Sequence, residues 1–508
     1  MKKFILLVNT VKYLKIRQIF FRLYYSARAK IRNIFGFKYI FSKESKSTTL
    51  KFIKSCASYS VFRDNEFNLL NLSKRFDDKI DWNYKDYGKL WTYNLAYFEY
   101  LREKSDLNLI YDFIDHISNI KEGLEPFPIS LRGINWIKFL TAYAIEDKKI
   151  DDSLYAQYYI LLNNLEYHLF GNHLLENGFS LLFGAYYFKD EKLYAKATVI
   201  LKTELDEQIL EDGGHFELSP MYHQIMLFRV LDCINLLQNN SWKNSELLTY
   251  LKKKASIMLG WLQNITYKNG NIPLLNDSAN HIAPTSNELF DYANNLNVSM
   301  VNKKLGKSGY RKVLKDRYEC ILDVGYIGAS YIPGHAHSDT FNFELNIDKK
   351  SFIVDSGLST YEINERRFYE RSTKAHNTVE VLKKDSSEVW GGFRVGNRAV
   401  VTEIIEKQNY IRATHDGYKK DYVLHTRSWK FETNKIIIVD ELNKEIDATV
   451  RFHFHPDIKE EEILKRVSIE NSTFKIKNYM YACEFNKLAT AKYIEINFNK
   501  NCRVKISI

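Results

Sequence analysis

The spacing of apolar residues changes near residue 305, and this change constrains the fold more than any other feature of the sequence. Between about residues 80 and 300, apolar side chains such as Leu95, Phe98 and Leu101 recur at intervals of three and four, which is typical of amphipathic helices. Breaks such as 212–214 divide this stretch into helices of similar length. A succession of helical hairpins of this kind closes most simply into an arc or a toroid.

Beyond residue 305 the apolar residues alternate with polar ones in short segments, for example 435–439 and 450–454. Many short strands without intervening helices predict antiparallel sheets, most simply a sandwich. We therefore expect an α+β multidomain chain in three parts: a basic N-terminal extension over 1–80, a helical domain over 81–305 and a sheet domain over 306–508.

Positive charge is concentrated at the N-terminus. Residues 1–54 contain fourteen Lys and Arg against one acid, Glu44, so the rest of the chain sums to −2 although the whole carries +11. The body of the protein is therefore not of the basic, nucleic-acid-binding type. Residues 10–35 mix basic and apolar side chains at helical spacing. This segment is predicted either to make a peripheral membrane contact or to pack on the body with its basic face in solvent.

The N-terminal residues and the number of cysteines indicate the cellular compartment of the protein. The apolar start at 4–8 is interrupted early by charge, and no clean cleavage site follows it, which is unlike a signal peptide. Five scattered cysteines without a C-x-x-C pair argue against a disulfide scaffold. A cytoplasmic location, or one at the inner face of a membrane, is therefore favoured over export.

The segment Gly334-His335-Ala336-His337 is the first candidate for chemistry. A turn after Gly334 would let one histidine bind a metal while the other faces a cleft. His337, Asp355 and His376 each lie near the end of a predicted strand, and two imidazoles with a carboxylate are a normal zinc ligand set. The alternative is three ordinary polar residues at strand ends.

Two further candidates lie in the helical half. Asn172 and His173 begin a helical pattern; either Asn172 caps that helix, or both residues donate to a bound anion. Ser219-Pro220 is a helix start, which places Tyr222 in the first turn, where the helix dipole favours a phenolate. The alternative for Tyr222 is a tyrosine that only packs.

Together these motifs resemble the heparinase II/III-like polysaccharide lyases, a family that includes alginate lyases. The resemblance covers about residues 91–456 and rests on Gly171-Asn172-His173, Glu217 with Ser219-Pro220 and Tyr222-His223, His335 with His337 and Asp339, and Arg371-Ser372-Thr373 with His376-Asn377-Thr378. It implies an N-terminal (α/α) toroid joined to a C-terminal antiparallel β-sandwich, with the active site between them.

The resemblance also implies roles for individual residues. Tyr222 and His335 match the catalytic pair, and Asn172 and His173 match the positions that engage the substrate carboxylate. His337, Asp355 and His376 match the ligands of a mainly structural zinc ion. The positions implied to bind sugar are Asn94, Arg132, Asn135 and Trp136, together with Glu217, Arg371 and Arg394.

The implied reaction is β-elimination on an acidic polysaccharide that contains uronic acid, in a setting that would suit surface-polysaccharide biosynthesis. Either Tyr222 or His335 takes the C5 proton, and Tyr222 protonates the leaving oxygen. Three other classes remain open: a glycoside hydrolase using Glu176 and Glu217, a metal-dependent hydrolase using the H-x-H motif, and a glycan-binding protein without turnover. A hydrolase of the second class should alternate strands and helices, whereas this chain segregates them.

Overall fold

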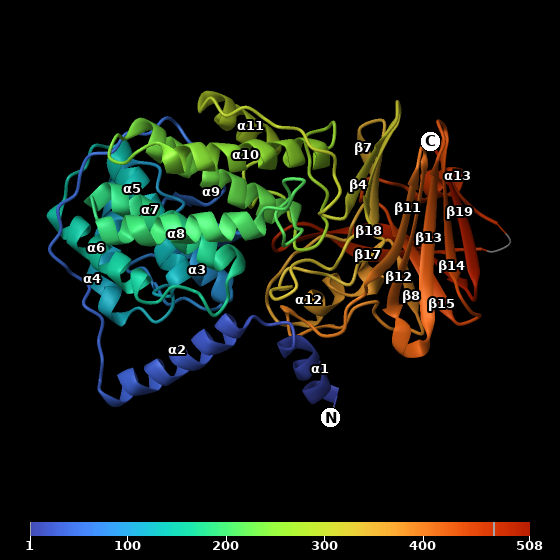
Figure 1. Ribbon diagram of the computed structural model, residues 1–508, viewed down its shortest axis with the longest axis horizontal. Coiled ribbons are helices and arrows are strands. Elements are labelled where there is room, and N and C mark those ends of the chain that lie inside the picture. The colour runs from blue at the N-terminus through green and yellow to red at the C-terminus, as the bar shows by residue number, and fades with distance from the viewer. Residues whose placement is uncertain (1, 471–472) are drawn as a thin grey trace.

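The computed structural model describes residues 2–470 and 473–508, with the helices on one side and the sheets on the other (Figure 1). The helical predictions are confirmed by nine consecutive helices in the described chain: α3 (Lys89–Tyr97), α4 (Leu107–His116), α5 (Pro126–Ala142), α6 (Lys148–Leu162), α7 (Gly171–Phe188), α8 (Glu191–Gln208), α9 (Pro220–Asn239), α10 (Glu246–Ile265) and α11 (Ser286–Asn295). Consecutive helices pack in pairs, as α5 with α6, α7 with α8 and α9 with α10, and α3, α5, α7 and α9 pack against one another in series, which makes the predicted toroid.

Helix α7 lies at the centre of the helical domain and is buried almost all round. Its small residues allow this close packing: a Cβ built on Gly184 would lie 2.7 Å from the ring of Tyr158 on α6. A helix that is apolar on every side is stable only inside a core. The centre of the toroid is therefore filled by side chains, and the space for a ligand lies at its ends.

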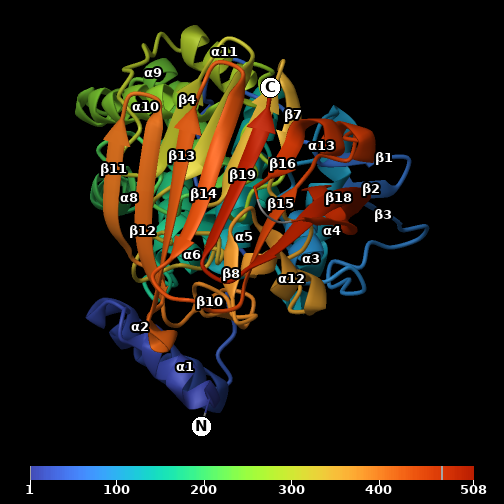
Figure 2. The same cartoon turned by 90° about the vertical axis from the view of Figure 1, so that its right-hand side faces the viewer.

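The sheet domain contains three antiparallel sheets of four or more strands in the described residues. The first, β4-β5-β6-β7, stands next to the helices, and the second, β11-β12-β13-β14-β19-β16, forms the far layer (Figure 2). The third has the order β17-β18-β15-β8. The strands are β4 (Tyr310–Leu314), β5 (Tyr318–Asp323), β6 (Phe343–Ile347), β7 (Lys350–Ile353), β8 (Val379–Val381), β11 (Val401–Lys407), β12 (Tyr410–Tyr418), β13 (Val423–Phe431), β14 (Lys435–Leu442), β15 (Ala448–His453), β16 (Val467–Ile469), β17 (Lys475–Glu484), β18 (Lys487–Phe498) and β19 (Asn501–Ser507).

Shorter elements surround these layers. Strands β9 (Val389–Trp390) and β10 (Arg394–Val395) form a small ribbon, and α12 (Glu365–Glu370) and α13 (Glu460–Arg466) lie among the strands. The N-terminal part forms α1 (Lys2–Val11), α2 (Ile16–Ile34) and a three-stranded sheet of β1 (Val61–Arg63), β2 (Glu66–Leu69) and β3 (Leu72–Arg75). Helices α1 and α2 stand beneath the body of the molecule (Figure 1).

Candidate active site

Tyr222 is presented by the start of α9, as the Ser219-Pro220 sequence predicts. Ser219 is the N-cap residue, and its Oγ accepts a hydrogen bond from the Tyr222 backbone N–H at 3.2 Å, while Pro220 occupies the first helical position. The same Oγ donates to the carbonyl oxygen of Asp277 at 2.7 Å. The cap therefore fixes the helix start and also ties it to the segment that holds His335.

Asp277 contacts His335 and His337 through its two carboxylate oxygens. Its Oδ2 atom lies 2.9 Å from His335 Nδ1, and its Oδ1 atom lies 2.8 Å from His337 Nε2. The guanidinium of Arg367 on α12 donates to both carboxylate oxygens, at 2.8 Å for the Nη2–Oδ2 bond. Burial alone would raise the pKa of Asp277, but Arg367 and the two histidines hold that pKa well below its usual range.

The rings of Tyr222 and His335 meet across the junction of the two domains, with centroids 3.9 Å apart and planes inclined by 30°. The Tyr222 hydroxyl lies 3.1 Å from the hydroxyl of Tyr361. Asn172 Nδ2 lies 3.5 Å from His335 Nε2, and Glu217 Oε2 lies 3.7 Å from the same nitrogen. Tyr222 and His335 lie 113 positions apart in the sequence and come from different domains, but they share one site.

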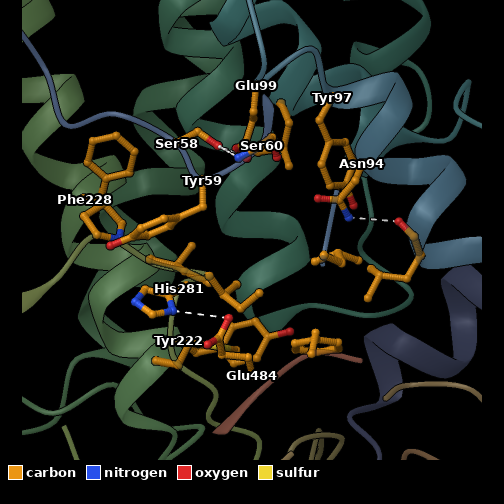
Figure 3. A pocket seen from close by; sticks show the side chains of 18 of the residues that line it. Ser58, Tyr59, Ser60, Asn94, Tyr97, Glu99, Tyr222, Phe228, His281 and Glu484 are labelled. Carbon is orange, nitrogen blue, oxygen red and sulfur yellow. Dashed lines mark hydrogen bonds and ion pairs between the residues drawn. The ribbon is translucent and has the colours of Figure 1, made fainter. Parts of the chain in front are cut away.

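A cavity of about 530 Å³ opens beside this pair, between the helices and the loops of the sheet domain (Figure 3). Seven aromatic side chains of the described chain line it: Tyr59, Tyr97, Phe127, Tyr222, Phe228, Tyr361 and Phe485. Aromatic faces in a concave site are suited to stacking against the apolar faces of sugar rings. The size and lining of the cavity suit an oligosaccharide segment.

The charged residues of this cavity are paired with one another. Arg229 bonds Glu176 through Nε at 3.2 Å and Glu99 through Nη2 at 3.2 Å. At the other side, Glu484 lies 3.3 Å from His281 (Figure 3). Glu484 also lies 2.9 Å from Lys487. Among the described residues that line the cavity, each basic side chain therefore has an acidic partner.

The protonation state of Tyr222 differs from the expectation that the helix dipole would favour a phenolate. Burial raises the pKa of Tyr222 above its usual value of 10.0, and the hydrogen bond from Tyr361 offsets this only in part. The expectation is not met because burial removes water from the phenolate form, and this desolvation outweighs any stabilisation by the start of α9. Tyr222 is a neutral phenol at neutral pH.

Asn172 and His173 lie in the first turn of α7, but they face different surroundings. The capping alternative for Asn172 is wrong, because the N-cap residue is Phe170 and Asn172 lies inside the helix. Asn172 lines the cavity, whereas His173 Nδ1 lies 3.0 Å from Glu166 Oε1 and its ring packs on Phe127. Burial alone would lower the pKa of His173, but the Glu166 carboxylate raises it above its usual value.

Two positions expected to bind sugar lie in the helical core instead. Arg132 is fully buried, and it donates to Gln157 Oε1 at 2.7 Å and to the carbonyl oxygens of Ala96 and Gly123. Trp136 is also fully buried. The expectation that they contact a sugar is therefore corrected: both side chains stabilise the toroid from within.

The other expected sugar-binding residues are placed differently from one another. Asn94 lines the cavity and donates to the Leu90 carbonyl, as Figure 3 shows. Asn135 donates to the Tyr97 carbonyl at 2.8 Å and faces an adjoining cavity of about 900 Å³. Glu217 is buried next to His335, and burial raises its pKa.

The two arginines of the sheet domain lie behind or outside the cavity. Arg371 is buried, and its Nε and Nη2 donate to the Ala336 carbonyl at 3.1 and 2.9 Å, which supports the His335 loop. Arg394 is exposed and stacks on Trp390. The expectation that Arg371 contacts substrate is corrected, because its guanidinium is enclosed beneath the loop.

The three expected zinc ligands lie close together beneath the His335 loop. His376 Nδ1 lies 2.8 Å from Asp355 Oδ2, and the rings of His337 and His376 have centroids 5.2 Å apart. Within the described chain, His337 Nδ1 and His376 Nε2 are buried without a hydrogen-bond partner. Even so, no described group of three or more His, Cys, Asp or Glu side chains has the geometry of a metal site.

Sequence reasoning missed three residues that organise the site: Asp277, Tyr361 and Arg367. Asp277 follows Asn276, which has a left-handed backbone with φ of 56°, and this Asn-Asp pair after an apolar run was the available signal. Arg367 lies in a run of charged residues that resembles an exposed helix. Asp277, Tyr361 and Arg367 act in the site through hydrogen bonds to residues that lie 58 to 139 positions away in the sequence.

Comparison with known proteins gives the same family for both halves of the chain. The family model described as heparinase II/III N-terminus matches residues 134–299, and the model described as heparinase II/III-like, C-terminal, matches residues 301–493. A heparin-sulfate lyase of Bacteroides stercoris is 23% identical over 317 residues, covering 56% of this chain and 45% of that protein. One of Bacteroides thetaiotaomicron is 22% identical over 298 residues, covering 50% and 41%. The chain thus spans less than half the length of these two relatives.

Solved structures show the same architecture. A crystal structure titled heparinase III superimposes with a TM-score of 0.65 at 16% identity, covering 85% of this chain and 80% of that one. A heparan sulfate lyase HepC mutant of Pedobacter heparinus gives 0.56 at 17% identity, covering 87% and 81%. At such identities the likeness shows the fold alone, a helical toroid followed by an antiparallel sandwich. Together with the two family models, it shows that this chain belongs to the heparinase II/III-like family.

Proposed function

We propose that this protein is a polysaccharide lyase, a carbon–oxygen lyase that cleaves a glycan containing uronic acid by β-elimination. The observation that carries the proposal is the contact of Tyr222 with His335, at 3.9 Å between ring centroids, beside a cavity lined by aromatic residues. The heparin-sulfate lyases among the relatives support the same reaction class.

The arrangement favours His335 as the general base and Tyr222 as the general acid. Asp277 accepts the Nδ1–H of His335, which leaves the Nε2 lone pair as an acceptor, 3.5 Å from the amide of Asn172, a residue that lines the cavity. His335 then takes the C5 proton of the uronate, and the neutral Tyr222 phenol protonates O4 of the leaving sugar. The C5–H and C4–O4 bonds break, a C4–C5 double bond forms, and no water is consumed.

Charge builds on the uronate carboxylate as the C5 proton leaves. The amide of Asn172 points to this region and can donate to that carboxylate, which stabilises the enolate-like transition state. Asn172 Oδ1 is buried without a partner in the described chain, so the amide is not held by other bonds of its oxygen. His173 lies one position further along α7, where its bond to Glu166 gives it a supporting role.

The pairing of charges in the cavity bears on the substrate. A chain with several sulfate groups on each sugar requires basic side chains that are free to bind them. The basic residues that line this cavity, Arg229, His281 and Lys487, already bond to carboxylates. We therefore expect a uronate polymer with few or no sulfate groups.

The experiment is a screen of uronate polymers, with and without sulfate, for the ultraviolet absorbance of a new unsaturated end. Tyr222→Phe should lower the rate by about 100-fold or more, because it removes the proton donor. Thermal unfolding should stay close to wild type, since the Tyr222 ring is kept. Cleavage without a double bond would indicate a hydrolase, and a fully active Phe variant would contradict the assignment of Tyr222.

A zinc ion bound by His337, Asp355 and His376 is a second proposal about this site. The partnerless nitrogens of the two buried histidines support it, although the side chains as placed do not form a complete ligand set. Such an ion would fix the base of the His335 loop, and no proton transfer needs it. Metal analysis should find about one zinc per chain, and a chelator should lower the melting temperature. An absence of bound metal after purification in zinc would remove the proposal.

A further inference from the structure

Helix α2 is attached to the protein by its polar face. Gln18 donates to the Leu169 carbonyl at 3.0 Å, Arg22 to the His168 carbonyl at 3.2 Å, and Arg28 to the Asn163 carbonyl at 2.7 Å. Tyr25 donates to the Leu165 carbonyl. These side chains satisfy the backbone of the segment that precedes α7. The helix therefore uses its hydrogen-bonding residues toward the body of the protein.

The apolar face of α2 consequently points to the solvent. Ile16 is 86% exposed, Leu23 68% and Ile34 77%. The exposed apolar residues follow helical spacing along one stripe: Ile16, Ile19, Phe20, Leu23, Tyr24, Ile31 and Ile34. A surface helix normally buries this stripe and exposes its polar side, so α2 has the reverse orientation.

Helix α1 continues this surface. It is held to the sheet domain by Thr10, whose hydroxyl accepts from the Trp390 indole N–H at 3.1 Å and lies 3.3 Å from the Val395 carbonyl oxygen. Just beyond the helix, the guanidinium of Arg398 lies over the ring of Tyr13. The exposed apolar residues of α1 are Phe4, Ile5, Leu7, Val8 and Val11. We call the exposed apolar residues of α1 and α2 together the apolar N-terminal face. Figures 1 and 2 show both helices projecting from the body on the same side.

Basic residues accompany this face. Lys12, Arg17, Lys30 and Lys38 are exposed, and residues 1–54 carry fourteen Lys and Arg against one acid. An exposed apolar stripe bordered by basic side chains matches the interface of a bilayer that contains anionic lipids. None of the helices in the described ranges is long and apolar enough to cross a membrane.

We infer that the apolar N-terminal face docks on an anionic membrane surface, with α1 and α2 lying in the plane of the headgroups. The apolar stripe enters the acyl boundary, and the basic residues contact lipid phosphates. The polar face of α2 stays on the protein, so docking requires no rearrangement of the contacts that hold the helix. This inference does not depend on the reaction that the cavity catalyses.

The test is flotation of the full chain with vesicles of phosphatidylcholine, alone or with about one-quarter phosphatidylglycerol. We expect binding to the anionic vesicles, weakening as salt is raised. Phe20→Glu combined with Leu23→Glu should reduce binding by about tenfold or more, because two apolar contacts are lost. Phe20→Ser combined with Leu23→Ser, which adds no charge, should act in the same direction.

The matched control is Val199→Glu combined with Leu464→Glu, two exposed apolar residues on α8 and α13. It adds the same charge elsewhere and should leave vesicle binding unchanged, and both pairs should keep the wild-type melting temperature. Failure of the wild type to float, or equal loss in both pairs, would overturn the inference. So would light scattering that shows a dimer dispersed by the Phe20 and Leu23 changes, with no vesicle binding.

Discussion

Among the described residues, two buried clusters each join one aspartate, one arginine and histidines, and one of the two contacts residues that line the cavity. In the sheet domain, Asp440 accepts from Arg427 at 2.7 and 2.8 Å and lies 2.7 Å from His425 Nε2. At the domain junction, Asp277 is bonded in the same way by Arg367, His335 and His337. The chemical groups are alike, but their surroundings differ.

The Asp440 cluster joins neighbouring strands and is enclosed. Arg427 and Asp440 face each other on β13 and β14, and the remaining nitrogen of His425 meets His415 at 3.0 Å. The Asp277 cluster instead joins a loop after α10, the His335 loop and α12. One of its imidazoles keeps Nε2 next to Asn172 and the ring of Tyr222. An ordinary stabilising cluster becomes a candidate catalytic one when one of its imidazoles contacts residues that line a cavity.

The largest expected effect compares one histidine from each cluster. His335→Gln should lower the rate of β-elimination by about 100-fold or more, because the base is removed. His425→Gln should weaken folding but leave the rate per folded molecule unchanged. Ultraviolet assays on samples corrected for folded fraction would measure both. Equal loss of activity in the two variants would break the comparison.

The two aspartates should affect stability alike and activity differently. Asp277→Asn and Asp440→Asn each leave a buried arginine without its carboxylate, which should cost about 3–5 kcal/mol of unfolding free energy. Denaturant unfolding would measure this cost. In Asp277→Asn, His335 also loses its orienting partner, so kcat should fall well beyond the loss of folded protein. If Asp440→Asn lowered kcat as far, the Asp277 carboxylate would have no special role.

The smallest expected effect concerns acid stability of the enclosed cluster. Burial alone would raise the pKa of Asp440, but Arg427 and His425 lower it to about 2, from an ordinary 3.8. A lowered pKa means that the ionised group stabilises the fold above pH 3.8 and loses this effect as the pH falls toward 2. The difference in unfolding free energy between wild type and Asp440→Asn should therefore shrink by about 2 kcal/mol between about pH 5 and about pH 2. A difference that stays constant over this range would mean that Arg427 and His425 do not lower the pKa of Asp440.

The sequence predicted the parts of the site that depend on local chemistry. Ser219-Pro220 predicted the start of α9 and the place of Tyr222 in its first turn, because capping involves only neighbouring residues. A turn is present at Gly334, where the Ala336 backbone N–H bonds to the Pro333 carbonyl, but His335 and His337 do not diverge to a metal and a cleft: both contact the carboxylate of Asp277. Asn172 was placed in the correct helix but given the wrong capping alternative, since the helix begins at Gly171, two residues earlier than capping by Asn172 would require.

Other features depended on segments that are distant in the sequence. Arg132 and Trp136 carry the right side chains for sugar binding, but the packing of α5 turns them into the core. The N-terminal segment has the amphipathic pattern that the sequence indicates. Its composition does not reveal that the carbonyl groups of residues 163–169 attract its polar face and leave the apolar face outside.

By itself, the sequence determined the order of a helical toroid and an antiparallel sandwich, because the period of apolar residues is a local property of the chain. It also determined which residue types were available for acid, base and anion binding. Only the tertiary structure decided that Asp277 orients His335, that Tyr222 stays protonated and that the cavity's basic residues are already paired. Burial and ion pairing are set by which distant segments meet, and no local pattern records that.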